Sequence, residues 1–435
     1  MPDNFFGPDK IIEEKRKYLI PCVYHFYKNP PQLVRGEMQY LYDHRGGRYL
    51  DFYAGVSVVN AGHCNPDITE VTCAQIKTLQ HTTTIYLTQP IVELAQRIAL
   101  IAPGNLSKTF FCNSGSEANE GALLLAKLYN GKAKFISLQS SLHGRTYMTM
   151  SITGLPLWRT EERLSSDVSF IPSPYCYRCP YGAVYPSCDL ACAAALESML
   201  QADGGSETAA FIAEPVAGNG GIIVPPSEYF LRIREITKKY GVLFICDEVQ
   251  TGFGRTGKTF AIEHWNTAPD IMTVAKALAN GLPTGAFIAT PDIADAYTKP
   301  GASTLGGNPV TAATALATLA FHQKHLLADR AAELGSYFMA RLNELQGKHS
   351  LIGDVRGKGL MIGAELVHEN RHPAPAALTD WILEQLKDRG LLIGKTGVGR
   401  NVLAFQPPLI ITKDNIDEAV TLLDEALQSI PEGML

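Results

Sequence analysis

An acid and an amine that could act in one site stand at the ends of two short apolar runs. Residues 242–246 are continuously apolar and end in Asp247 and Glu248, and residues 271–275 end in Lys276. Unbroken apolar runs of this length are typical of strands buried on both faces of a parallel sheet. Because such sheets bind ligands beyond the carboxyl ends of their strands, we expect the acid and the amine at one edge of one sheet.

This pair of residues suits pyridoxal phosphate (PLP). The cofactor needs a lysine for a Schiff base and an acid that keeps its ring nitrogen protonated, so that the ring can accept electrons when a substrate loses a proton at Cα. Side chains two apart on a strand share a face, so Asp247 is expected to point at the ring nitrogen and Val249 to lie under the ring. Gln250 is placed to hydrogen-bond the ring hydroxyl. Alone, Asp247 would more simply be a solvated acid, but with Lys276 the PLP site is favoured.

The stretches DEVQTGFGRTG at residues 247–257 and TVAKALANGLP at residues 273–283 resemble the class III PLP-dependent aminotransferases. The resemblance covers nearly the whole chain. It implies an α/β enzyme of PLP fold type I, similar to aspartate aminotransferase. In that family Asp247 would pair with the pyridine nitrogen, and Lys276 would be the Schiff-base residue and the proton carrier.

A phosphate site is predicted where a candidate strand, residues 109–112, leads into Ser114-Gly115-Ser116-Glu117. Ser114 and Glu117 have the spacing of a capping box, and the free N–H groups and dipole of a helix N-terminus bind phosphate. Plain helix capping is the simpler interpretation of these residues alone. Because the acid and the lysine lie downstream, we predict that Gly115 and Ser116 bind the PLP phosphate, and the family carries the same run here.

The segment Leu142-His143-Gly144-Arg145 also matches the family. The resemblance implies that Leu142 covers the outer face of PLP, where an aromatic residue is more usual, and that His143 lies close to the ring. In members that act on γ-aminobutyrate, ornithine or acetylornithine, the arginine at Arg145 contacts a substrate carboxylate, a task that suits the guanidinium group. A surface ion pair is the alternative for Arg145.

Two further residues are candidates for substrate binding. Glu214 ends the candidate strand at residues 209–213, and in the family it often pairs with a C-terminal arginine that binds an α-carboxylate. Many members have that arginine where this chain has Ala404, so Glu214 has lost this partner or found another, such as Arg400. Tyr53 belongs to an N-terminal arm that lines the substrate pocket in the family, and a buried structural tyrosine is the alternative.

The stretch PGASTLGGNP at residues 300–309 resembles a family segment whose Ser-Thr pair reaches the PLP phosphate of the neighbouring subunit. Here that pair is Ser303 and Thr304. The resemblance therefore implies a homodimer with shared active sites.

An irregular stretch at residues 172–192 holds four cysteines with the spacing of two short motifs, namely Cys176, Cys179, Cys188 and Cys192. This spacing could form a zinc knuckle. Because the stretch is rich in proline, glycine and tyrosine, we favour a surface insertion with free thiols and predict no metal.

Seven candidate strands alternate with helical patterns, which predicts a mainly parallel seven-stranded sheet with helices on both faces. The candidate strands are residues 109–112, 135–138, 168–171, 209–213, 242–246, 271–275 and 286–289. The expected divisions are residues 1–64 (an N-terminal arm and part of a small domain), 65–320 (a large PLP-binding domain) and 321–435 (a small α+β domain).

The composition excludes several classes of partner. The chain of 435 residues has a net charge of -5 and no basic block, which argues against nucleic acid and anionic membranes. We find no signal sequence and no apolar run long enough to span a membrane. Nine cysteines without a signal indicate a reducing compartment, and we expect a cytoplasmic protein.

The resemblance implies an aminotransferase that moves an amino group from an amino acid, ω-amino acids included, to pyruvate, glyoxylate or 2-oxoglutarate. The overall organisation resembles the alanine–glyoxylate and ω-amino acid enzymes, whereas Arg145 resembles the γ-aminobutyrate and ornithine branch. A racemase, an epimerase or a phospholyase of the same family is the alternative. Rivals from other classes are a non-catalytic homologue and an oxidoreductase that uses Gly252, Gly254 and Gly257 to bind a dinucleotide. We interpret these glycines as a loop, because Asp247 and Glu248 separate them from the strand.

Overall fold

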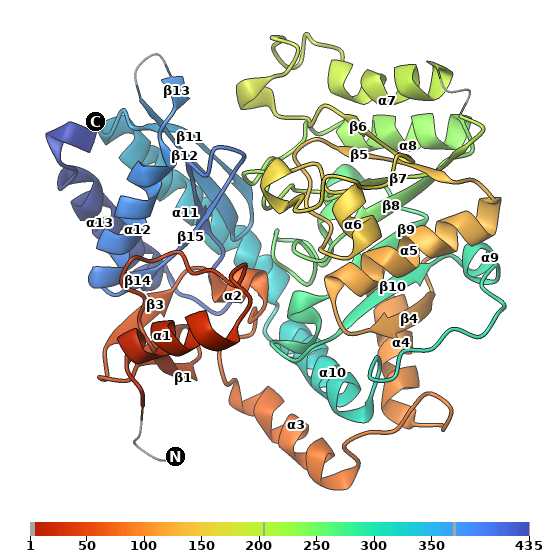
Figure 1. Ribbon diagram of the computed structural model, residues 1–435, viewed down its shortest axis with the longest axis horizontal. Helices are drawn as coiled ribbons and strands as arrows, with labels where there is room; N and C mark the ends of the chain where they lie inside the picture. Colours follow the sequence, from red (N-terminus) through yellow and green to blue (C-terminus); the bar gives the residue numbers. More distant parts are fainter. Residues whose placement is uncertain (1–4, 203–204, 369–370, 435) are drawn as a thin grey trace.

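The computed structural model describes residues 5–202, 205–368 and 371–434 of the chain. Within this part, the largest sheet has seven strands in the order β4-β10-β9-β8-β7-β5-β6 (Figure 1). All neighbouring pairs are parallel except the two that β10 forms with β4 and β9. The strands are β4 (Lys108–Cys112), β5 (Lys134–Leu138), β6 (Val168–Ile171), β7 (Thr208–Ala213), β8 (Leu243–Asp247), β9 (Ile271–Val274) and β10 (Gly285–Ala289).

The predicted fold class and all seven predicted strands are confirmed, with strand ends shifted by no more than a residue. The helices of this half of the molecule are α3 (Pro66–Thr78), α4 (Gln89–Ile101), α5 (Gly115–Asn130), α6 (Tyr147–Ser151), α7 (Ala191–Ala202), α8 (Tyr229–Lys239), α9 (Pro291–Ala294) and α10 (Pro309–Lys324).

The two faces of the sheet are covered by different helices, and this fixes where the acid of β8 points. Leu243 and Ile245 pack in the apolar cluster that includes α5, whereas Phe244 and Cys246 pack in the cluster that includes α7 and α8. Because side chains alternate along a strand, Asp247 continues the row of Leu243 and Ile245. The acid therefore ends β8 on the α5 face.

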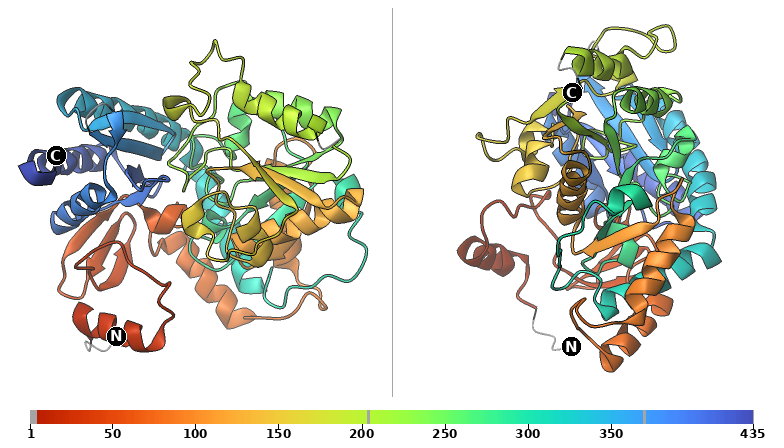
Figure 2. Two further views of the ribbon diagram at one scale, coloured as in Figure 1. Left: turned by 45° about the horizontal axis from the view of Figure 1, so that its top comes forward. Right: turned by 90° about the vertical axis from the view of Figure 1, so that its right-hand side faces the viewer.

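The other half of the molecule joins the two ends of the chain. In one sheet β1 (Leu33–Glu37), β2 (Tyr40–Asp43) and β3 (Arg48–Asp51) are extended by β14 (Leu391–Leu392), which runs parallel to β3. Figure 2 shows the N-terminal segment and the C-terminal elements together on the same side of the large sheet. The expected domain boundaries after residues 64 and 320 stay predictions.

The second small sheet has the order β11-β12-β16-β15, with β13 paired to β12. Its strands are β11 (Ile352–Lys358), β12 (Met361–His368), β13 (His372–Pro373), β15 (Gly394–Thr396) and β16 (Val402–Phe405). The helices of this half are α1 (Pro8–Tyr18), α2 (Ala54–Ser57), α11 (Leu327–Lys348), α12 (Ala376–Asp388) and α13 (Lys413–Gln428). None of the helices in the described ranges is long and apolar enough to cross a membrane.

The glycines that match a dinucleotide-binding pattern lie in a loop after β8, as predicted. Gly254 and Gly257 have φ angles of 86° and 89°, a left-handed conformation that favours glycine. Between them, the buried Arg255 donates hydrogen bonds to the carbonyl oxygens of Leu360 and Pro407. No helix opens at Gly257, so this loop lacks the helix N-terminus that would receive a pyrophosphate.

Candidate active site

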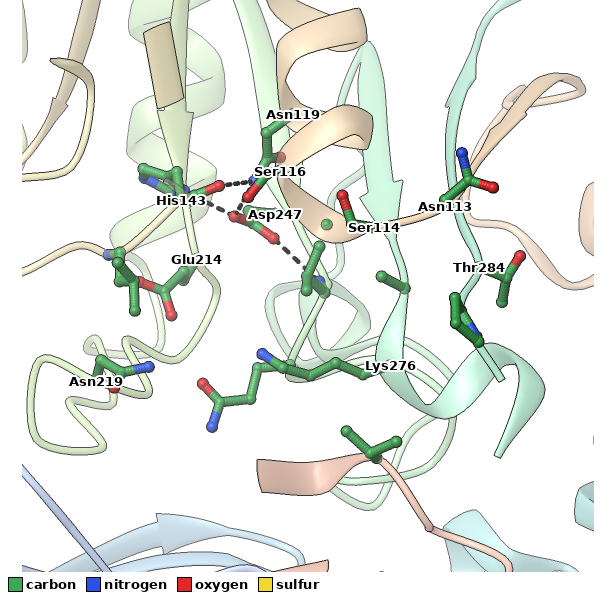
Figure 3. A pocket seen from close by; sticks show the side chains of 18 of the residues that line it. Asn113, Ser114, Ser116, Asn119, His143, Glu214, Asn219, Asp247, Lys276 and Thr284 are labelled. Atoms are coloured by element: carbon green, nitrogen blue, oxygen red, sulfur yellow. Dashed lines mark hydrogen bonds and ion pairs between the residues drawn. The ribbon is translucent and has the colours of Figure 1, made fainter. Parts of the chain in front are cut away.

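A cavity of about 380 Å³ lies at the carboxyl ends of β7, β8 and β9, next to the N-terminus of α5 (Figure 3). It brings together residues that are far apart in the sequence. Of the residues predicted to bind cofactor or substrate, its lining contains Gly115, Ser116, Leu142, His143, Glu214, Asp247, Val249, Gln250 and Lys276.

Asp247 is the centre of a hydrogen-bonded cluster at the floor of this cavity, where it is 3% exposed. Its Oδ2 accepts hydrogen bonds from His143 Nδ1 at 2.7 Å and from Asn119 Nδ2 at 2.8 Å, and its Oδ1 accepts from Val249 N at 3.0 Å. Thr273 Oγ1 donates to Asn119 Oδ1 at 2.7 Å and so fixes the orientation of the amide. These donors stabilise the negative charge on Asp247 and hold the carboxylate in one position.

Asn119 was not among the predicted site residues. It lies on α5 and also donates to the carbonyl oxygen of His143 at 2.7 Å, so it holds the acid and the histidine together. Its signal in the sequence is a polar residue on a helix face that is otherwise apolar, between Ala118 and Ala122. A buried polar side chain in such a position needs partners, and here both partners belong to the site.

Lys276 lies two residues after the end of β9 and extends into the cavity, and its amine approaches the side on which Glu214 and Asn219 lie (Figure 3). Its φ angle is 44°, a left-handed conformation that costs energy for a residue with a side chain. Burial lowers the pKa of the amine below its usual value, and the negative charges of Asp247 and Glu214 only partly oppose this shift. A lowered pKa increases the fraction of uncharged amine, which is the form that attacks a carbonyl group and takes up protons.

Glu214 forms another wall of the cavity and is 4% exposed. Its two oxygens accept hydrogen bonds from Leu142 N at 2.9 Å and Gly218 N at 3.0 Å. Burial raises the pKa of this carboxyl group to about 7, with a smaller contribution in the same direction from the charge of Asp247. Ala404, which replaces the arginine of many relatives, is 1% exposed and pairs with Gly394 between β15 and β16.

The N-terminus of α5 lines the cavity at the residues where the sequence predicts a phosphate cradle. Ser114 caps the helix, its Oγ accepting from Glu117 N at 3.2 Å, and the N–H groups of the first turn have no acceptor within the helix. Gly115 lies so close to Val249 that a Cβ atom would stand 2.7 Å from Val249 Cγ1. This helix end, the paired acid and the lysine together fit the groups that PLP needs, and Val249 lines the same cavity.

A second cavity of about 390 Å³ adjoins the first, since Leu142, Asn219 and Lys276 line both. Tyr53, one of the predicted substrate residues, lines this second cavity only. Its ring lies directly over Gly394, where a Cβ atom would stand 2.0 Å from Tyr53 Cε2. Lys276 can therefore be reached from both cavities, which suits a residue that meets a cofactor on one side and a substrate on the other.

Three predicted residues lie outside both cavities. Arg145 is exposed, and its backbone N–H donates to Ser116 Oγ at 3.1 Å. Thr304 is also exposed, and Ser303 Oγ accepts from Asn113 Nδ2 at 3.2 Å, where Asn113 lines the first cavity. The predicted roles of Arg145, Ser303 and Thr304 stay predictions.

Gln250 lines the first cavity, but its amide already has a partner. Its Nε2 donates to Gln406 Oε1 at 3.0 Å, and that same oxygen accepts from Ser57 Oγ at 2.9 Å. The predicted hydrogen bond from Gln250 to the ring hydroxyl of PLP stays a prediction.

The cysteine-rich stretch is attached to the small C-terminal sheet through the buried carboxylate of Glu365. Arg178 Nε donates to Glu365 Oε1 at 2.5 Å, Arg356 Nη1 lies 2.9 Å from Oε2, and the hydroxyl of Tyr175 is hydrogen-bonded to the same oxygen. The four cysteines predicted to be free are unpaired, namely Cys176, Cys179, Cys188 and Cys192. Across the described ranges there is no group of three or more side chains that could hold a metal ion. Metal analysis of the purified protein tests the predicted metal-free loop.

Comparison with known proteins identifies the family of the chain that carries this site. Residues 27–427 match the model of the family Aminotransferase class-III, so the chain belongs to this family. It is therefore a PLP-dependent aminotransferase by family, in agreement with the fold and with the lysine, acid and phosphate cradle described above.

Individual relatives support this assignment. The chain is 41% identical over 433 residues to an alanine–glyoxylate aminotransferase 2 homologue of Arabidopsis thaliana, covering 99% of this chain and 90% of the relative. It is 39% identical to a leucine/methionine racemase of Thermococcus litoralis, covering 97% and 96%. A PLP-bound amine transaminase from an uncultivated Pseudomonas species has a TM-score of 0.90 at 31% identity, covering 95% of this chain and 98% of that one.

Proposed function

We propose that this enzyme transfers an amino group from an amino acid, ω-amino acids included, to a keto acid such as pyruvate, glyoxylate or 2-oxoglutarate. The observation that carries the proposal is the lysine with a lowered pKa that stands in the same cavity as the Asp247 cluster. The relative named alanine–glyoxylate aminotransferase, which is 41% identical, supports this choice of substrates.

Each residue has a definite task in this proposal. When PLP is bound it supplies an electron-accepting ring, and Asp247 holds a proton on the ring nitrogen. Gly115 and Ser116 bind the phosphate through backbone N–H groups and the positive end of the helix dipole. The Lys276 amine would take the proton from the substrate Cα and return it later, because burial lowers its pKa and so favours the uncharged form that can accept a proton.

The enclosing residues position the reactants. Val249 and Leu142, which line the cavity, would hold the two faces of the cofactor ring, while His143 holds Asp247 in place through the 2.7 Å hydrogen bond. We propose that Tyr53 and Glu214 contact the substrate, since they line the two cavities that meet at Lys276.

Racemisation is the second candidate function, and two observations favour it. The chain is 39% identical to a protein named leucine/methionine racemase, and Ala404 departs from the arginine that the family resemblance implies at this position. A racemase takes the proton from one face of Cα and returns it to the other, so it needs no keto acid.

Two experiments test these functions: a reductive labelling of the lysine and a set of incubations with single enantiomers. Borohydride reduction of the holoenzyme should label Lys276 irreversibly with reduced PLP. Single enantiomers of amino acids are then offered with and without pyruvate, glyoxylate or 2-oxoglutarate. Transamination predicts that amino transfer needs the keto acid and that the enantiomer stays unchanged without it. Racemisation in the absence of a keto acid would overturn the transaminase proposal, and release of phosphate from a phosphorylated substrate would indicate a phospholyase.

We also propose a homodimer with shared active sites, in which Ser303 and Thr304 reach the phosphate site of the partner subunit. Two observations support this arrangement: Thr304 is exposed, and the neighbouring Ser303 accepts a hydrogen bond from Asn113 of the first cavity. For location we propose the cytoplasm, and the nine free cysteines support a reducing compartment. The Arabidopsis relative carries the word mitochondrial in its name, so fractionation of cells is the appropriate test.

A further inference from the structure

The second cavity carries positive charge without a matching carboxylate in its wall. Among its charged lining residues in the described ranges, Lys276, Lys395 and Arg400 are basic and none is acidic. Lys395 is 8% exposed, and it forms an ion pair with Asp380, which is half-exposed and lies outside the lining. Burial lowers the pKa values of both lysines, so the lasting positive charge of this cavity is that of Arg400, and it attracts ligands of the opposite charge.

Arg400 is held in this cavity by its backbone and by two aromatic rings. Its φ angle is 54°, and its N–H donates to the carbonyl oxygen of Gly397 at 3.0 Å, which closes a tight turn between β15 and β16. The guanidinium carbon lies 5.8 Å from the ring centroid of Tyr24 and 5.6 Å from that of Phe26. Such rings stabilise the cation but accept no conventional hydrogen bonds, so the N–H groups of the guanidinium stay available to a ligand.

This turn is fastened to the wall of the first cavity. Thr396 Oγ1 donates to the carbonyl oxygen of Gly218 at 2.8 Å, and Gly397 N donates to that of Asn219 at 3.1 Å. Gly218 N in turn donates to Glu214 Oε2 at 3.0 Å. The arginine is therefore positioned relative to the reaction centre before a ligand arrives, which lowers the entropic cost of binding.

Apart from Asn219 and Thr396, the rest of the wall is apolar or aromatic. Trp158, Tyr24, Phe26 and Tyr53 form a row with neighbouring ring centroids 5.8 to 6.4 Å apart. A ligand of this cavity should thus combine an anionic group with a carbon body that can pack against rings.

We propose that Arg400, with Lys395 beside it, binds a carboxylate group of the substrate, and that the substrates are amino and keto acids whose carbon body is apolar. This assignment rests on the proposed function, because it takes the second cavity as the place where the substrate meets Lys276. A planar guanidinium binds a carboxylate through two hydrogen bonds, and the low exposure of the neighbouring ammonium strengthens the attraction.

The test uses the holoenzyme and two unreactive probes of equal length, hexanoate and hexanamide, with binding measured by calorimetry. Arg400→Met removes the charge and keeps the chain length, Arg400→Lys keeps the charge, and Arg45→Met is the control on an exposed turn between β2 and β3. We expect the Kd for hexanoate to rise roughly ten- to hundredfold in Arg400→Met, to recover partly in Arg400→Lys and to stay unchanged in Arg45→Met. The Kd for hexanamide should change less than about threefold.

A hexanoate Kd that Arg400→Met leaves within about twofold of the wild type would overturn the assignment, as would an equal loss of affinity for hexanamide, which would mean packing alone. Turnover gives an independent readout: kcat/KM should fall for amino acid donors but not for hexylamine, which has no carboxylate. If the wild-type enzyme transfers no amino group from any donor yet binds hexanoate through Arg400, the proposed function fails and the carboxylate site stands.

Discussion

At the scale of single residues, Lys276 combines a left-handed backbone with an amine whose pKa burial lowers. Lys276→Ala should retain PLP, because the phosphate cradle and Asp247 do not depend on the lysine, but it should lose nearly all turnover. We expect a fall of roughly 10²–10⁴-fold or more in kcat, the usual effect of removing a general base. Absorbance after dialysis measures the retained PLP, and single-turnover kinetics measure the loss. A variant that turns over at the wild-type rate would show that another group carries the proton.

Arg145 poses a separate question, because its side chain is exposed and lines neither cavity. If it contacts a substrate carboxylate, Arg145→Gln should raise KM for carboxylate-bearing donors by about tenfold with little change in kcat, since one charge-assisted interaction is lost from binding. Hexylamine is the matched control donor, and its KM should not change. An unchanged KM for the amino acids would remove Arg145 from the site and leave Arg400 as the proposed contact.

At the scale of elements, the proposed phosphate cradle at the first turn of α5 needs Gly115 to have no side chain. In Gly115→Ala the new Cβ would meet Val249 Cγ1 at 2.7 Å, so either Val249 or the helix end must shift within the cavity lining. We expect the Kd for PLP to rise at least about tenfold, because the displacement of Val249 or of the helix end disturbs the proposed binding site. The matched control is Gly347→Ala near the end of α11, where a Cβ meets nothing within 4 Å and PLP binding should be unaffected. Fluorescence titration of the apoenzyme with PLP measures both.

The sequence predicts elements better than it predicts contacts between them. The strands that carry Asp247 and Lys276 were predictable because each is an apolar run that stops at a charged residue, and the capped helix after β4 because of its Ser114 and Glu117 spacing. The hydrogen bond between Asn119 and Asp247 could not be predicted, because it joins residues 128 positions apart through the packing of α5 on the sheet. Local patterns do not encode such long-range geometry.

The same limit applies to the second cavity. The sequence suggests Arg400 only as a partner for Glu214, because nothing in the spacing shows that it adopts a positive φ angle or lies beside Tyr24 and Phe26. These rings come from the N-terminal arm, where Lys28 N and Asn29 N both donate to the carboxylate of Glu384 on α12. Only the pairing of the two ends of the chain brings them to the cavity.

At the scale of the whole molecule, a buried carboxyl group links stability to pH. Glu248 is 1% exposed, its Oε1 accepts from Ile262 N at 2.8 Å, and its other oxygen is hydrogen-bonded to the hydroxyl of Thr251. Burial raises the pKa of this carboxyl group to about 7. Between the unfolded pKa of about 4.3 and this value, the folded chain binds a proton that the unfolded chain does not, so stability falls as the pH rises.

Glu248→Gln should remove this part of the pH dependence, because an amide can accept from Ile262 and donate to Thr251 without titrating. Relative to the wild type, the variant should gain up to roughly 3 kcal/mol of stability as the pH rises from about 4.5 to about 7.5. Apparent Tm values at both pH values measure the difference. Glu235→Gln, on the exposed face of α8, is the control and should follow the wild type. If the apparent Tm values of Glu248→Gln and of the wild type change equally with pH, a group other than Glu248 carries the titration.

The homodimer proposal predicts that two impaired variants regain activity when they are mixed. Lys276→Ala lacks the proton carrier, and Thr304→Glu would place a negative charge against the phosphate site of the partner subunit. If the sites are shared across a two-fold axis, a mixed dimer contains one site with both defects and one intact site. Random exchange of subunits should therefore return about a quarter of the wild-type activity, while each protein alone stays nearly inactive at limiting PLP. If Thr304 instead acted within its own chain, each site of the mixed dimer would keep one defect. Mixing would then restore no activity, and the proposal of shared active sites would be wrong even if the protein sediments as a dimer.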